Sequence, residues 1–213
     1  MKFTFKPSLR QVGKVEGIAP ISELANEPMI FGGDWQFADD NGGPLTRKIL
    51  DEIHGEVMRD HALQDIFQRF DHCMKGWYPA IPGWHCDAVP RSQKYSQPDL
   101  HGINGEQHFL CLIASCENHT LTEFLREDIT VEVDEENVWS SVDREVTNTQ
   151  GKNVQRIKEG NIYMFDQQSL HRATVTENPG WWLFFRVSCT NRKPTNEIRR
   201  QCQVYIPENQ WGW

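Results

Sequence analysis

The chain has no C-x-x-C pair and no dense cysteine framework, because its six cysteines are scattered over 213 residues. A chain of this length can bury a sufficient core without disulfides, so we expect reduced thiols and a cytoplasmic location. It also lacks an apolar run of the roughly 18 residues that a membrane helix needs. The first residues alternate apolar and basic side chains and lack the continuous apolar stretch of a secretory signal, so we expect them to form a strand.

Basic residues are outnumbered: 22 Lys and Arg stand against 30 Asp and Glu, which gives a formal net charge of -8. Such a surface repels a phosphate backbone on average, so we do not expect long nucleic acid as a partner. A small molecule or a peptide is the expected substrate class. The net charge does not argue against a single nucleotide as substrate. Nothing in the sequence indicates an oligomeric state.

Residues 44–70 contain the clearest helical pattern in the chain. Pro44 suits the first turn, where its missing amide hydrogen would have had no intrahelical partner. We therefore predict a helix that supports the fold rather than carries the chemistry. Its apolar stripe recurs every four residues, at Leu45, Ile49, Ile53 and Val57.

After about Pro79 the pattern changes to short β-rich runs separated by Gly, Pro, Asn and Asp, which favours an antiparallel sandwich or barrel. The acidic segment 123–145 is expected to be mainly a solvated hairpin or loop with one strand. Residues 12–43 look irregular and are expected to wrap the sheet. The predicted strands are His108–Ser115, Thr120–Leu125, Ile129–Val133, Asn161–Phe165, His171–Thr176 and Trp181–Thr190.

A histidine and an aspartate stand two residues apart at His85 and Asp87. On an extended segment this spacing turns both side chains to one face, where they can share a metal ion. The tripeptide alone is common, and an aspartate beside a histidine often only hydrogen-bonds it. Cys86 between them should point to the opposite face and act as a packing residue.

A second histidine, His171, follows a predicted strand and a polar turn. Two imidazoles and one carboxylate on one face leave three open positions on an octahedral iron(II), enough for a bidentate co-substrate and dioxygen. His108 is the main rival ligand, but no Arg-x-Ser sequence follows it at a comparable distance.

The apolar run Trp181–Thr190 carries one arginine, Arg186, and period-two alternation places it on the same face as Trp182, Phe184 and Ser188. A buried guanidinium requires an anion, and its planar fork fits a carboxylate. Two explanations remain open from the residues alone, namely a bound carboxylate ligand or an internal salt bridge to Asp or Glu.

The ordered set His85-x-Asp87, His171 and Arg186-x-Ser188 resembles the iron(II)/2-oxoglutarate-dependent dioxygenase superfamily over residues 77–189. The resemblance implies a double-stranded β-helix, or jelly roll, flanked by helices. It also implies that His85, Asp87 and His171 bind Fe(II), while Arg186 and Ser188 bind the distal carboxylate of 2-oxoglutarate, with dioxygen as oxidant. The run that contains Thr122 is similar to the phytanoyl-CoA hydroxylase-like branch, which adds Thr122 as a co-substrate residue, although the Pro-Gly-Ser-His stretch of that branch is missing.

These observations predict a mainly β, jelly-roll or cupin-like single domain over residues 1–213. Within it we expect residues 1–76 as helical or irregular N-terminal support, 77–190 as the jelly-roll core and 191–213 as a C-terminal extension. The presence of an acid at Asp87 favours hydroxylation or desaturation over halogenation, whose enzymes replace that acid with a small residue.

The alternative function is a cupin-like metal-binding protein without oxidative turnover. A degenerate oxygenase that acts through interactions alone is a third reading, against which the intact triad argues. Trp84 and Trp182 are expected to pack in the core, with an aromatic substrate pocket as the alternative role. Tyr163 and Gln107 are expected in the core or at its rim, and Arg91 in solvent.

Overall fold

The computed structural model describes residues 1–17, 24, 26–58, 63–114 and 121–199. The chain is mainly β, with 37% of residues in strands and 20% in helices. Every strand pair in the described part is antiparallel. The expectation of a mainly β fold with antiparallel sheets is therefore confirmed, although the sheets are not closed into a barrel.

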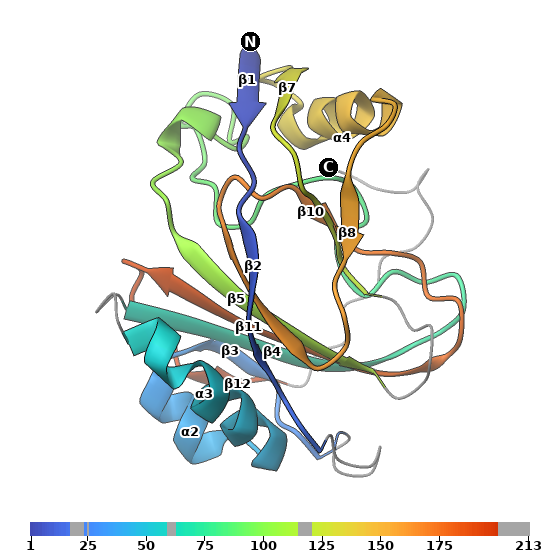
Figure 1. The fold of residues 1–213 in the computed structure, drawn as a ribbon. Helices are drawn as coiled ribbons and strands as arrows, with labels where there is room; N and C mark the ends of the chain where they lie inside the picture. Colours follow the sequence, from blue (N-terminus) through green and yellow to red (C-terminus); the bar gives the residue numbers. More distant parts are fainter. Residues whose placement is uncertain (18–23, 25, 59–62, 115–120, 200–213) are drawn as a thin grey trace.

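The largest sheet has seven strands in the order β12-β3-β4-β11-β5-β9-β2 (Figure 1). The longest strands, β4 and β11, lie side by side and pair over their whole length. The bounds are β2 Leu9–Lys14, β3 Ile30–Gly33, β4 Leu63–Cys73, β5 Gln107–Ala114, β9 Asn161–Asp166, β11 Gly180–Thr190 and β12 Glu197–Ile198.

Two smaller sheets complete the β structure. One has three strands in the order β10-β6-β8, namely His171–Arg172, Glu123–Leu125 and Val154–Arg156. The other pairs β1, Lys2–Phe5, with β7, Ile129–Glu132. Strand β1 confirms the expectation that the chain begins with a strand.

Helices α2, Trp35–Asn41, and α3, Pro44–Val57, cover one face of the large sheet (Figure 1). The predicted stripe of α3 is buried there, together with the apolar side chains of β11 and β5 on that face. Helix α4, Val138–Asn148, packs instead against β7 beside the smaller sheets. No helix in the described residues is long and apolar enough to cross a membrane.

The predicted helix over residues 44–70 is wrong in its second half. Helix α3 ends at Val57, and Leu63–Cys73 forms β4 in the middle of the large sheet. Strand β4 buries the polar side chains Gln68, Arg69 and Asp71 beside apolar ones and shows no clean alternation of apolar and polar residues, so the sequence pattern did not separate it from the helix. Residues 1–76 are consequently not only support, because β2, β3 and β4 belong to the sheet itself.

The acidic segment 123–145 also differs from the expected hairpin or loop, because α4 begins at Val138. The helix buries Val138, Val142 and Val146, which recur every four residues and could have been recognised in the sequence. Of the predicted strands, those near β5, β6, β7, β9 and β11 are confirmed within the described residues, whereas β10 is only two residues long. Residues 115 to 120 and 200 to 213 lie outside the described part, so the ends of two predicted strands and most of the C-terminal extension fall there.

Candidate metal centre

The two histidines of the motif face each other across a short antiparallel bridge. The amide of His85 donates to the carbonyl of His171 at 3.1 Å, and the amide of His171 donates back to the carbonyl of His85 at 2.9 Å. This reciprocal pair brings the imidazole centroids to 4.5 Å. Residues that lie 86 positions apart in the chain are therefore fixed as neighbours by two backbone hydrogen bonds.

Both imidazoles are oriented from behind by carbonyl oxygens. Nδ1 of His85 lies 2.8 Å from the carbonyl of Gly83, and Nδ1 of His171 lies 2.9 Å from the carbonyl of Ser169. A carbonyl can only accept, so each Nδ1 carries a proton, and Nε2 is the nitrogen left to contact a metal ion. Such carbonyl contacts are the usual outer support of metal-bound histidines.

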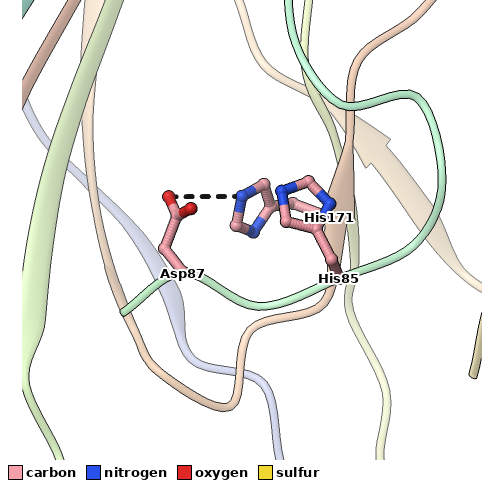
Figure 2. Close-up of side chains that lie close together, drawn as sticks. All are labelled: His85, Asp87 and His171. Carbon is pink, nitrogen blue, oxygen red and sulfur yellow. Dashed lines mark ion pairs between the residues drawn. The ribbon is translucent and has the colours of Figure 1, made fainter. Parts of the chain in front are cut away.

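Asp87 completes the cluster. One ligand atom from each of His85, Asp87 and His171 can be chosen so that all lie within 4.8 Å of one another (Figure 2). Oδ2 of Asp87 is 3.4 Å from Nε2 of His171. The three predicted ligands are thus brought together, and this group could hold a metal ion.

The loop that carries Asp87 is tied down at both ends. The amide of Trp84 donates to Oδ1 of Asp143 on α4 at 2.8 Å. The carbonyl of Ala88 accepts from Nε2 of Gln167 at 3.0 Å, and Ala88 itself adopts a left-handed φ of 58°. A residue without glycine's freedom is strained there, so these contacts hold the ligand loop in an unfavourable but defined conformation.

Burial and neighbouring charges set the protonation of the cluster. Burial, followed by the charge of His171, lowers the pKa of His85 to about 4. Burial by itself would raise the pKa of Asp87, but Arg186 and His171 together hold that pKa well below its usual value. At neutral pH His85 is therefore a neutral imidazole and Asp87 a carboxylate, which are the forms that bind a metal.

The cluster opens into a cavity of about 150 Å³, a size comparable to cavities that hold small organic molecules. Apolar side chains in its wall surround the ligand atoms and two arginines. The lining residues are Phe67, Arg69, Ala80, Ile81, His85, Asp87, Leu110, Thr122, His171, Ala173, Phe184 and Arg186.

Arg186 lines this cavity, and its Nη1 donates to Oδ2 of Asp87 at 2.6 Å. The guanidinium forms the internal salt bridge that was one of the two explanations for its burial. It also faces the cavity, where the other explanation, a bound carboxylate ligand, stays open. Ser188 is fully buried, its Oγ lies 2.9 Å from Nδ1 of His108, and it is not among the cavity-lining residues. Thr122 does line the cavity.

Arg69 is the lining residue that the sequence analysis missed. It is 3% exposed, and its guanidinium carbon lies 5.7 Å from the ring centroids of Phe67, Trp182 and Phe184. Arg69 lies among other polar residues of β4, such as Gln68 and Asp71, so it does not stand out in the sequence as Arg186 does in the apolar run of β11. Residues 63–70 were also predicted to be part of a helix.

The remaining candidates have structural positions. His108 is not part of the metal cluster, and Cys86 packs in an apolar core as expected. Trp84 and Trp182 are almost fully buried in two different cores and do not line the cavity, which confirms the packing interpretation. The hydroxyl of Tyr163 accepts from the amide of Lys158, and Arg91 is exposed.

The donor set fits a first-row transition metal. Two imidazole nitrogens and one carboxylate oxygen on one side of a cavity suit iron(II) and related ions, whereas calcium and magnesium prefer oxygen ligands alone. Comparisons of the chain with protein-family models, with curated proteins and with solved structures give no match. The assignment of a function therefore depends on the site itself.

Proposed function

We propose that the protein is an Fe(II)/2-oxoglutarate-dependent oxygenase that hydroxylates a small molecule or an amino-acid or peptide side chain. The observation that carries this proposal is the His85, Asp87 and His171 cluster at the base of a cavity that also contains two arginines. Two histidines and one carboxylate leave open positions for a chelating co-substrate and dioxygen. The arginines supply the positive charge that a dicarboxylate requires.

The strand order supports the double-stranded β-helix that this family resemblance implies. From β4 onward the chain passes back and forth between the large sheet and the three-stranded sheet extended by the His85 bridge, except that β6 and β8 both belong to the smaller sheet and are separated by β7 and α4. Strands β4, β5, β9 and β11 are neighbours in the large sheet, while the His85 segment, β10, β6 and β8 are neighbours in the other. The metal cluster bridges the segments that precede β5 and follow β9.

Iron(II), when bound, would supply the oxidative chemistry, in which 2-oxoglutarate is decarboxylated to succinate and one oxygen atom enters a substrate C–H bond. The chain's own contribution is geometric and electrostatic. Arg186 orients the Asp87 carboxylate, and the carbonyls of Gly83 and Ser169 orient the two imidazoles. The apolar walls, among them Phe67, Leu110 and Phe184, limit the access of water.

Succinate formation tests the proposal without knowledge of the substrate. Anaerobically purified protein is loaded with Fe(II), mixed with 2-oxoglutarate and exposed to oxygen, and succinate is quantified. We expect slow, substrate-uncoupled formation of succinate by the native chain and none above background by His171→Ala. The exposed His101 provides the matched control, and His101→Ala should retain the native rate.

A metal-binding protein without oxidative turnover would behave differently in the same experiment. It would bind Fe(II) in a manner that depends on His171, yet form no succinate. Absence of succinate from protein that demonstrably holds one iron per chain and binds 2-oxoglutarate would reject the oxygenase proposal in favour of this alternative.

A further inference from the structure

Phenylalanine rings and a guanidinium group form a row across four neighbouring strands of the large sheet. The ring centroid of Phe31 on β3 lies 4.4 Å from that of Phe67 on β4, which lies 5.9 Å from that of Phe184 on β11. The guanidinium carbon of Arg199, directly after β12, lies 5.1 Å from the Phe31 centroid. These strands are adjacent in the order β12-β3-β4-β11, so the contacts follow one another across the sheet (Figure 1).

The row lies on the face of the sheet opposite to helices α2 and α3. On β3, Ile30 is buried in the core under those helices, and its neighbour Phe31 therefore points to the other face. Phe67 and Phe184 line the cavity at the metal cluster, whereas Phe31 and Arg199 do not. The row thus begins inside the cavity and continues past its lining to the edge strand β12.

Exposure increases along the row. Trp182, whose ring contacts that of Phe184, is 1% exposed, while the three phenylalanines are half-buried and Arg199 is exposed. The cavity of about 150 Å³ is smaller than the about 300–1,000 Å³ of typical ligand sites. A substrate of ordinary size must therefore extend beyond the cavity, and the row is a continuous aromatic surface for the part that lies outside.

We propose that the outer end of this row, made of Phe31, Phe67 and Arg199, binds an uncharged aromatic or heteroaromatic ring of the substrate. Phe31 and Arg199 are then residues that determine specificity. This inference rests on the proposed function and names a substrate class for it. A planar ring can pack against phenylalanine rings and a guanidinium plane, as the residues of the row already pack against one another.

The arginines also determine which rings fit. A cation is attracted to the face of an aromatic ring, but guanidinium groups already occupy such positions: Arg199 near Phe31, and Arg186 at 5.8 Å from the centroid of Phe67. A cationic substrate would meet a like charge at both rings. Arg199 pairs with Glu197, so this pair adds no net charge that would attract an anion. The row should therefore favour an uncharged ring over a cationic ring of the same shape.

Matched small probes test this inference directly. Benzamide is an uncharged ring, benzamidine is a cation of nearly the same shape, cyclohexanecarboxamide is a saturated ring of similar size, and 1-methylthymine is a heteroaromatic base. Binding of each to the Zn(II)-loaded full-length protein is measured by ligand-observed NMR titration, without co-substrate or oxygen. We expect benzamide or 1-methylthymine to bind about 10-fold more tightly than cyclohexanecarboxamide and benzamidine.

A substitution outside the cavity localises the binding to the row. Phe31→Leu keeps an apolar side chain but removes the ring, so it should weaken binding of the preferred aromatic probe about 5-fold to 10-fold. Binding of cyclohexanecarboxamide and of Zn(II) should stay nearly unchanged. Phe3→Leu is the matched control, because Phe3 is also half-buried on a strand but belongs to a different sheet, and it should alter none of these affinities.

Arg199→Gln tests the charge argument at an exposed position, where folding is not at risk. The preference for benzamide over benzamidine should fall from about 10-fold to less than about 3-fold, because the competing cation is gone and Glu197 loses its partner. The exposed Arg91→Gln should preserve the preference. Equal binding of benzamide and cyclohexanecarboxamide, no binding of any ring, or undiminished ring binding by Phe31→Leu would overturn the inference.

The outcomes separate this inference from the proposed function, because the probe titrations require no turnover. Selective ring binding that depends on Phe31, in a protein that forms no succinate, would uphold the ring site and reject the oxygenase. Succinate formation by a protein that does not discriminate among the probes would uphold the oxygenase and reject the ring site. Where the ring site is upheld, the tighter of benzamide and 1-methylthymine identifies the substrate ring as an aromatic side chain or a nucleobase.

Discussion

The two faces of β11 have opposite compositions and opposite roles. On the outer face, Leu183, Phe185 and Val187 are buried in the core that α3 covers. On the inner face, Phe184 and Arg186 line the cavity, and Ser188 contacts His108. One strand thus contributes to the stability of the fold with every second residue and to the site with the residues between. Substitutions on one face should therefore alter stability, and substitutions on the other should alter ligand binding.

The largest expected effect is the loss of a metal ligand from the inner side. A structural metal site of four ligands contributes about 10–16 kcal/mol, so one ligand accounts for roughly 3–4 kcal/mol, or several hundred-fold in affinity. We expect this loss of Fe(II) affinity for His85→Ala, measured by anaerobic titration, with little change in the unfolding midpoint of the metal-free protein. Unfolding of the variant without metal would instead mean that His85 supports the core.

The opposite effect is expected on the outer face. Leu183→Ala removes a fully buried side chain from the core under α3 and should lower the free energy of unfolding by about 3 kcal/mol, as denaturant titration can measure. Metal affinity of the folded protein should stay within about twofold. A parallel loss of metal affinity would show that the two faces are coupled through the strand.

An intermediate effect is expected at Gln167, which is buried and is not one of the residues that line the cavity. Its Oε1 accepts from the amides of Asn104, Gly105 and Glu106, and its Nε2 donates to the carbonyl of Ala88, next to Asp87. Gln167→Ala should therefore weaken metal binding about 10-fold to 100-fold, the usual range for groups behind a ligand. Gln168→Ala, at a partly exposed neighbouring position, is the control, and an equal effect there would contradict the assignment.

The smallest expected effect is a pH dependence of stability on the inner side. Burial, followed by the charge of Arg186, lowers the pKa of His108 to about 3, whereas the unfolded value is near 6.5. Between these values the unfolded chain binds the proton and the folded chain does not, so stability is complete above about 6.5 and falls as the pH decreases. The slope is about 1.4 kcal/mol per pH unit for one histidine.

Removal of this histidine should reduce that slope. Replacing both partners, His108→Leu with Ser188→Ala, avoids leaving a buried polar group without its partner. Chemical denaturation between pH 4 and pH 6 should then show a dependence shallower by about one proton. His101→Gln, at an exposed position, should leave the slope unchanged, and an unchanged slope in the double variant would contradict the contribution of His108.

Some helices and strands could be predicted from the sequence and others could not. The four-residue repeat of α3 was recognisable because one-sided burial imposes a period on the residues, and β11 was recognisable because its run is almost entirely apolar. Strand β4 was not, because its burial on both faces removes that period. The valines of α4 carried a usable repeat, but the surrounding acidic residues favoured the interpretation of a solvated loop.

The same division holds at the site. The sequence by itself determined that His85 and Asp87 share a face and that Arg186 lies on the inner side of β11, since both follow from alternation along one extended segment. Only the tertiary structure decided which groups meet across strands: Arg186 with Asp87, Ser188 with His108, and Arg69 with the cavity. The physical reason is that such contacts depend on the register and pairing of strands that are far apart in the chain, which local patterns do not specify.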